Sequence, residues 1–137
     1  MNTDPLNMAR LSGPLHAVLR ITTALTFVSH GSLKLLGFPA SQMPAPPLAS
    51  LMGVAGLMEI VGGLLVLVGL FTRPIAFLLA GEMAAAYWMA HAPQGPFPVL
   101  NMGESAYLFC FVFLWLSAAG AGPWSLDAAR GEGKAAA

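Results

Sequence analysis

Charged residues are scarce in this sequence. Only 9% of its 137 residues are Asp, Glu, Lys or Arg, whereas 57% are hydrophobic. A soluble domain carries roughly a quarter charged residues, so a chain of this length could not cover itself with a surface of ordinary polarity. Six basic and six acidic residues cancel, and no basic cluster that would bind nucleic acid is present. These shortages exclude a soluble, disordered or nucleic-acid-binding protein and indicate a small integral membrane protein.

The sequence also has a single cysteine, Cys110, and few of the patterns that carry known chemistry. One thiol excludes an internal disulfide, a paired-thiol redox centre and a zinc site built from cysteines. No phosphate-binding loop, dinucleotide-binding fingerprint or nucleophile elbow is present. His30 and His91 are predicted at different depths in the membrane, which disfavours a haem held between them. We therefore expect neither a metal site nor a cofactor carried by the chain itself.

Long apolar segments make up most of the chain. A helix needs about 20 mostly apolar residues to cross the hydrocarbon core of a bilayer, and four segments qualify, each bounded by Pro, Gly or polar residues. The predicted spans are approximately residues 14–36, 48–71, 74–91 and 101–119. They predict an all-α fold, an integral membrane four-helix bundle. We place this domain at residues 1–127 and predict a disordered tail, rich in Gly, Ala and Lys, at residues 128–137.

The distribution of Lys and Arg predicts the orientation, because cytoplasmic loops of membrane proteins are enriched in these residues. Outside the spans, Arg10 precedes the first, and Arg73 lies between the second and the third. Two more, Arg130 and Lys134, follow the fourth span. The loops at residues 37–47 and 92–100 contain neither. The sequence thus predicts four crossings of a bacterial-type cytoplasmic (inner) membrane, with both termini in the cytoplasm.

Several ionisable residues fall inside the predicted spans, where each costs roughly 2.5 to 3.5 kcal/mol on insertion scales. Such groups face the interior of a bundle and mark functional sites by default. Glu59 and Glu82 lie near the middle of the second and third spans, while His30 and Lys34 lie in the outer third of the first. The set predicted to form an intramembrane polar pocket is Arg20, His30, Lys34, Glu59, Glu82 and Glu104. The aromatic side chains expected to line this pocket are Tyr107, Trp88 and His91.

Helical spacing supports this prediction. Polar residues recur every three or four positions along the first span, from His16 through Arg20 to Lys34. Small residues lie one turn from Glu59 on both sides, where they allow another helix to approach; they are Ala55, Gly56, Gly62 and Gly63. Two carboxylates at one depth do not both ionise easily, and a protonated acid beside a histidine is the starting point of a proton relay. The alternative is structural, with the acids paired to Arg20, His30 or Lys34 and serving only helix packing.

Five motifs, in order, resemble those of the DoxX family of small membrane proteins. They are His30-Gly31-Ser32-Leu33-Lys34-Leu35-Leu36-Gly37, Gly56-x-x-Glu59-x-x-Gly62-Gly63 with Gly69-Leu70-x-Thr72-Arg73, Gly81-Glu82-Met83, Asn101-x-Gly103-Glu104-x-Ala106, and Gly120-x-Gly122-x-x-Ser125-Leu126-Asp127. The resemblance covers most of residues 14–127. It implies a four-helix membrane protein associated with redox physiology, because the family is named after a subunit of a quinone-linked sulfur-oxidising complex. The resemblance supplies no catalytic residues. The pocket residues are therefore predicted only from the cost of burying charged groups and from their helical spacing.

Together these features favour an inner-membrane protein of redox metabolism that binds a quinone or similar small molecule in the polar pocket. Whether the protein is an enzyme is left open. In an enzyme it would be a membrane subunit of a quinone-linked oxidoreductase, without a redox cofactor of its own. Besides the lipid bilayer, the expected partners are a redox protein that supplies electrons or further copies of this chain. Two alternatives stay open: a small proton-coupled transporter in which Glu59 and Glu82 bind protons, and a non-catalytic assembly or scaffold subunit.

Overall fold

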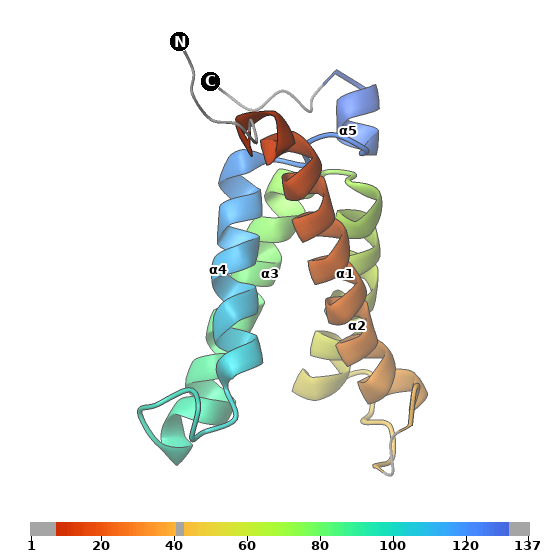
Figure 1. Cartoon of the computed structure of the whole chain (residues 1–137). Helices are drawn as coiled ribbons and strands as arrows, with labels where there is room; N and C mark the ends of the chain where they lie inside the picture. Colours follow the sequence, from red (N-terminus) through yellow and green to blue (C-terminus); the bar gives the residue numbers. More distant parts are fainter. Residues whose placement is uncertain (1–7, 41–42, 132–137) are drawn as a thin grey trace.

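The chain folds into helices joined by short connections. The structure, a computed structural model, describes residues 8–40 and 43–131, and this part of the chain contains no strand. The predicted all-α class is therefore confirmed for the described residues. Four long helices form two antiparallel pairs (Figure 1). Helix α1 packs mainly on α2, and α3 mainly on α4, whereas α1 and α4 touch less.

The helices follow the predicted apolar segments closely. In chain order they are η1 (Met8–Leu11), α1 (Ser12–Leu36), α2 (Leu51–Val68), α3 (Thr72–Ala86), the π-helical turn η2 (Tyr87–His91), η3 (Ala92–Gln94), α4 (Glu104–Ala119) and α5 (Leu126–Ala129). Among the described residues, three segments are long and apolar enough to cross a membrane, namely residues 8–36, 51–68 and 72–94, and the fourth predicted span is not among them. Helix α4 is a shorter apolar helix of 16 residues.

Helix α2 is shorter than the predicted span 48–71 because both of its ends are capped. The Ser50 side chain accepts a hydrogen bond from the Gly53 N–H at 3.0 Å, which fixes the first turn. Gly69 ends the helix in the left-handed conformation, φ +67°, which glycine adopts without steric penalty. The chain then turns at once into α3, which begins at Thr72.

Helix α4 begins three residues after the predicted start at residue 101. The side-chain oxygen of the buried Asn101 accepts a hydrogen bond from the Gly103 N–H at 2.8 Å, and this turn delays the helix. After α4, residues 120–125 are not helical, and the short helix α5 ends at Ala129, two residues beyond the predicted end of the domain. Residues 132–137 of the predicted tail lie outside the described residues.

Aromatic and small side chains form the core between the helices. The Phe27 ring of α1 is fully buried, and its centroid lies 4.7 and 5.2 Å from those of Phe113 and Phe109 on α4. Close contact between α1 and α2 depends on glycine, because a Cβ added to Gly31 would come within 2.7 Å of the Gly56 carbonyl oxygen. The buried core comprises Ala24, Phe27, Val66, Ala76, Leu79, Ala80, Met83, Ala106, Phe113 and Leu116.

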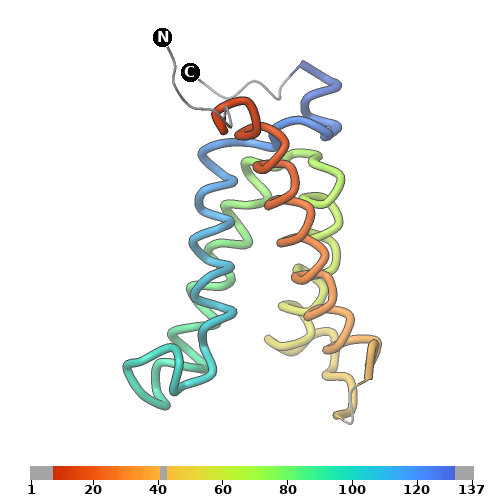
Figure 2. The backbone as a smooth tube through the Cα atoms, in the orientation of Figure 1, coloured from red at the N-terminus to blue at the C-terminus, as the bar shows by residue number. Residues whose placement is uncertain are grey.

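The two ends of the bundle differ. At one, which we call the closed end, η1, the turn from α2 to α3 and α5 come together (Figures 1 and 2). At the other, the open end, the two helix pairs diverge, and the connections that follow α1 and η3 lie here. Because η1 and α5 share the closed end, the chain crosses the length of the bundle an even number of times. The cytoplasmic location of that end stays a prediction.

Candidate functional site

Arg20, one of the predicted pocket residues, lies at the closed end and is completely buried. Its guanidinium donates hydrogen bonds to the carbonyl oxygens of Val66 and Leu67 in the last turn of α2, at 3.4 and 3.5 Å. It also donates to the carbonyl oxygens of Pro123 and Trp124, at 3.4 and 2.7 Å. A cation at a helix C-terminus satisfies carbonyls that the helix itself leaves unpaired. Arg20 therefore ties α1 to α2 and to the segment after α4.

Three further side chains join Arg20 in what we call the closed-end network, which consists of His16, Arg20, Arg73 and Asp127. Asp127 accepts hydrogen bonds from the Phe71 and Thr72 N–H groups, both at 2.9 Å, and so caps α3. This cap explains why α3 begins two residues before the predicted start at residue 74. Burial acts to raise the pKa of Asp127, but the hydrogen bonds from Thr72 and Phe71 and the charge of Arg130 outweigh it and hold that pKa below its ordinary value.

The other two members of the network bind the end of α4. Arg73 donates hydrogen bonds to the carbonyl oxygens of Ser117, at 3.4 Å, and of Ala118. A ring nitrogen of His16 lies 2.8 Å from the Gly120 carbonyl oxygen. Each side chain of the closed-end network is thus engaged with a helix end or with the residue that follows one. The network is structural.

Three other predicted residues come together farther along the bundle, and we call them the charge cluster. Lys34 of α1 forms an ion pair with Oε1 of Glu59 on α2, whose side chain is only 2% exposed. Glu82 of α3 lies near both, because α3 packs on α2 where Leu79 contacts Gly62, and these two residues lie one turn from Glu82 and from Glu59. Oε2 of Glu59 and both carboxylate oxygens of Glu82 are buried and have no hydrogen-bond partner among residues 8–40 and 43–131. Lys34 lies 14 residues after Arg20, about 21 Å along α1. Arg20 therefore belongs to a different site from the three residues of the charge cluster.

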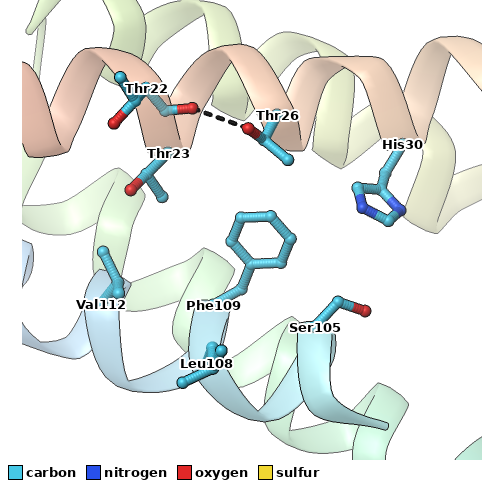
Figure 3. Close-up of a pocket in the computed structure, with 8 residues that line it drawn as sticks. All are labelled: Thr22, Thr23, Thr26, His30, Ser105, Leu108, Phe109 and Val112. Carbon is cyan, nitrogen blue, oxygen red and sulfur yellow. Dashed lines mark hydrogen bonds between the residues drawn. The ribbon is translucent and has the colours of Figure 1, made fainter. Parts of the chain in front are cut away.

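A groove of about 350 Å³ lies between α1 and α4 (Figure 3). Its lining residues are Thr22, Thr23, Thr26, His30, Ser105, Leu108, Phe109 and Val112. The rings of His30 and Phe109 meet edge to face, with their centroids 5.6 Å apart. In Figure 3, Ser105 lies across the groove from His30.

The polar side chains of the groove fall into two kinds. The Thr22 and Thr26 hydroxyls donate hydrogen bonds to backbone carbonyls of their own helix, at 2.8 and 3.0 Å. The side chains of Thr23, His30 and Ser105, by contrast, have no hydrogen-bond partner within residues 8–40 and 43–131. The groove therefore offers hydrogen-bonding groups from both α1 and α4 that the fold itself does not use.

The predicted aromatic lining lies elsewhere, where α3 and α4 meet at the open end. The Tyr87 ring contacts those of Trp88, His91 and Tyr107, with centroids 5.7, 6.4 and 5.8 Å away. Nδ1 of His91 lies 3.0 Å from the carbonyl oxygen of the buried Asn101. The structure thus brings Trp88, His91 and Tyr107 together, and uses them to hold the connection between the two helices.

The last predicted pocket residue, Glu104, is exposed at the first position of α4. A carboxylate there complements the helix N-terminus. Within the described part of the chain, no three His, Cys, Asp or Glu side chains are grouped so as to hold a metal ion. Cys110 is an unpaired, partly buried cysteine on α4.

Sequence reasoning missed Asp127 and Asn101, which organise the two ends of the molecule. Asp127 caps a helix that begins 55 residues earlier in the chain, and spacing within one helix cannot reveal such a contact. The only signal was the place of both residues in motifs shared with a known family. Ser105 of the groove was also missed, because it lies outside the polar stripe predicted for the first span.

Helices long and apolar enough to cross a membrane, with the charged side chains of Arg20 and Glu59 buried between them, define this chain as a small helical membrane protein. Residues 15–92 match the DoxX family model, and the chain belongs to that family. An uncharacterised protein of Haemophilus influenzae is 44% identical over 116 residues, which cover 81% of this chain and 87% of that protein. The inner membrane protein YphA of Escherichia coli K12 is 30% identical over 124 residues, covering 80% and 86%. No solved structure gives a significant match.

Proposed function

We propose that this protein binds a quinone, or a small molecule of similar chemistry, in the groove between α1 and α4. The observation that carries the proposal is the set of groove side chains without internal hydrogen bonds, namely Thr23, His30 and Ser105. Ligand sites typically combine a mainly apolar wall with a few convergent polar groups. The name of the Escherichia coli relative supports an inner-membrane location, and we place the closed end on the cytoplasmic side.

The groove suits an oxygen-bearing ring. His30 and Ser105 lie at one end, and Thr23 lies seven residues, or about 10 Å, along α1 from His30. A ring with oxygen substituents on opposite edges can accept hydrogen bonds near both ends of such a groove. Leu108, Phe109 and Val112 supply the apolar surface for the ring and its substituents. Because the groove opens at the side of the bundle, a lipid-soluble ligand can enter from the bilayer.

In this proposal the electrons come from a partner redox protein, and the chain positions the ligand. His30 donates a hydrogen bond to a carbonyl oxygen of the oxidised ring and accepts one from the hydroxyl of the reduced ring. Ser105, across the groove, does the same with its hydroxyl group. The protein thus acts as the membrane subunit of a redox system.

The test is a binding titration with decylubiquinone and a short-chain menaquinone, using the purified full-length protein in nanodiscs and isothermal titration calorimetry. We expect His30→Ala and Ser105→Ala each to weaken binding about tenfold, which corresponds to one lost hydrogen bond of about 1.4 kcal/mol. Ser117→Ala is the matched control on the same helix, because its hydroxyl bonds the Leu114 carbonyl and lies outside the groove.

Two results would overturn the proposal. One is the absence of binding for both quinones, together with the absence of any quinone in organic extracts of the purified protein. The other is binding that the groove variants and the control reduce equally. Either result would favour the scaffold interpretation.

A further inference from the structure

The charge cluster is unbalanced. It holds one cation, Lys34, and two carboxylates, Glu59 and Glu82, whose mutual interactions link α1, α2 and α3. Lys34 binds only one oxygen of Glu59, and the remaining three carboxylate oxygens are buried without partners in the part of the chain that the structure describes. A net negative charge away from water is costly unless a bound cation neutralises it.

No other charged side chain of the described residues compensates this charge. Helix α4, which packs along α3, has only Glu104 as a charged residue, and its other titratable groups are Tyr107 and Cys110. On α1, His30 lies one turn before Lys34 and faces the groove. Arg20, about 21 Å away along the same helix, is engaged with four backbone carbonyls.

We propose that the charge cluster is a binding site for one proton, shared by Glu82 and Glu59. A hydronium ion transfers the proton to a carboxylate oxygen of Glu82, where an O–H bond forms, and leaves as water. Glu82 then donates a hydrogen bond to Oε2 of Glu59, while Lys34 donates to Oε1 of the same carboxylate. This arrangement makes the cluster neutral and gives the buried second oxygen of Glu59 a partner.

The position of the site gives the proton a structural effect. Lys34 and Glu59 belong to the helix pair α1 and α2, whereas Glu82 belongs to the pair α3 and α4. The proton therefore joins the two helix pairs. Its release leaves two negatively charged carboxylates, one on each helix pair, that repel each other. The site is independent of the quinone proposed for the groove, and it is expected in the ligand-free protein.

Infrared spectroscopy of the full-length protein in lipid vesicles tests this inference, because a protonated carboxyl group has a C=O band separate from those of carboxylates and amides. We expect the band at neutral pH in the quinone-free protein, and its loss in Glu82→Gln. Glu59→Gln should also lose it, because Lys34 and Glu82 then form a neutral ion pair. Glu104→Gln, which changes an exposed glutamate on α4, is the matched control and should keep the band.

Circular dichroism identifies any variant that fails to fold, and each of the two cluster variants tests the proposal alone. A wild-type protein without the band at neutral pH would overturn it, as would a band that survives in either folded cluster variant. Loss of the wild-type band on adding Na⁺ would show that the site prefers a metal cation, and would also overturn it. Quinone binding that fails while the band behaves as expected would refute the proposed function and leave the proton site intact.

Discussion

The closed end and the charge cluster use their charged side chains in opposite ways. At the closed end, the buried Arg20 binds four backbone carbonyls, and Asp127 binds two backbone N–H groups. In the charge cluster, Lys34 binds one oxygen of Glu59, and the Glu82 oxygens have no partner among the described residues. Because buried polar groups without partners oppose folding, the closed end serves stability, and the charge cluster serves a purpose that stability does not explain.

The groove shows the same contrast. Thr22 and Thr26 satisfy their hydroxyls within α1, whereas Thr23, His30 and Ser105 do not find partners in the described fold. The framework at the closed end is largely paired, and only Nε of Arg20 and the Thr72 hydroxyl are buried there without a partner among the described residues. In the candidate sites, by contrast, Glu82 and the three groove side chains have no hydrogen-bond partner in the described part of the chain. The difference can be tested by substitutions at the closed end, in the charge cluster and in the groove.

The largest effect is expected from Arg20→Ala. This change leaves four backbone carbonyl oxygens without their charged donor, and each such hydrogen bond contributes about 1.5 to 3 kcal/mol. We expect the free energy of unfolding to fall by about 3 kcal/mol or more, measured by SDS titration in mixed micelles with circular dichroism. Arg73→Ala, which removes a partly exposed arginine, is the control and should lose about 1 kcal/mol. Equal losses of unfolding free energy in the two variants would contradict a special role for the buried guanidinium of Arg20.

A smaller effect is expected from Lys34→Met, which leaves Glu59 buried and unpaired. We expect a loss of about 2 kcal/mol in the same assay, because removing one partner of a buried pair exposes the other to its full desolvation penalty. The double variant Lys34→Met/Glu59→Met should recover most of that loss, because apolar residues of similar volume replace a buried ion pair with little net cost. A double variant no more stable than Lys34→Met would show that this pair is part of the framework.

Asp127 should give the closed end a modest dependence on pH. Its pKa in the folded protein lies below the ordinary value of 3.8. The stabilisation is therefore complete above that value and is lost as the pH falls through it toward the lower, folded pKa. Asp127→Asn should cost about 1 kcal/mol at pH 7, the usual contribution of a helix cap.

Unfolding of wild type and Asp127→Asn at pH 7 and at pH 3 checks this prediction, and the gap between the two proteins should narrow at the lower pH. A gap that stays constant would mean that the carboxylate charge plays no part in capping α3.

The smallest effect on stability is expected in the groove. Ser105→Ala should leave the free energy of unfolding within about 0.5 kcal/mol of wild type, since its hydroxyl bonds nothing in the described chain. The same variant is expected to weaken quinone binding about tenfold. A loss of stability comparable to that of Asp127→Asn would place Ser105 in the framework and weaken the distinction between the two regions.

Much of the fold was predictable from apolar runs interrupted by Pro and Gly. Those interruptions coincide with the ends of the four long helices to within a few residues, and the burial of Glu59 agrees with its place in a strip of small residues. The start of α3 was not predictable, because Asp127 caps it from the far end of the chain. Contacts of this kind depend on how helices are arranged, which the periodicity of one helix does not encode.

The candidate site was predictable in its residue types but not in its grouping. One polar stripe on the first span joined Arg20, His30 and Lys34, yet the structure gives them three different surroundings. The sequence left Arg20, His30 and Lys34 as possible partners of the buried acids, whereas the structure pairs Glu59 with Lys34. The rotation of α2 about its own axis decides that choice, and small-residue packing against α1 sets the rotation.

The unequal lengths of α1 and α4 have a consequence for the surrounding lipid. The 25 residues of α1 extend about 37 Å and the 16 residues of α4 about 24 Å, so neither matches a hydrocarbon core of about 30 Å. Hydrophobic mismatch of this kind tilts a long helix and thins the bilayer beside a short one. Since these two helices flank the groove, we expect the bilayer at its mouth to be locally deformed and acyl-chain length to be one of the variables that control entry into it.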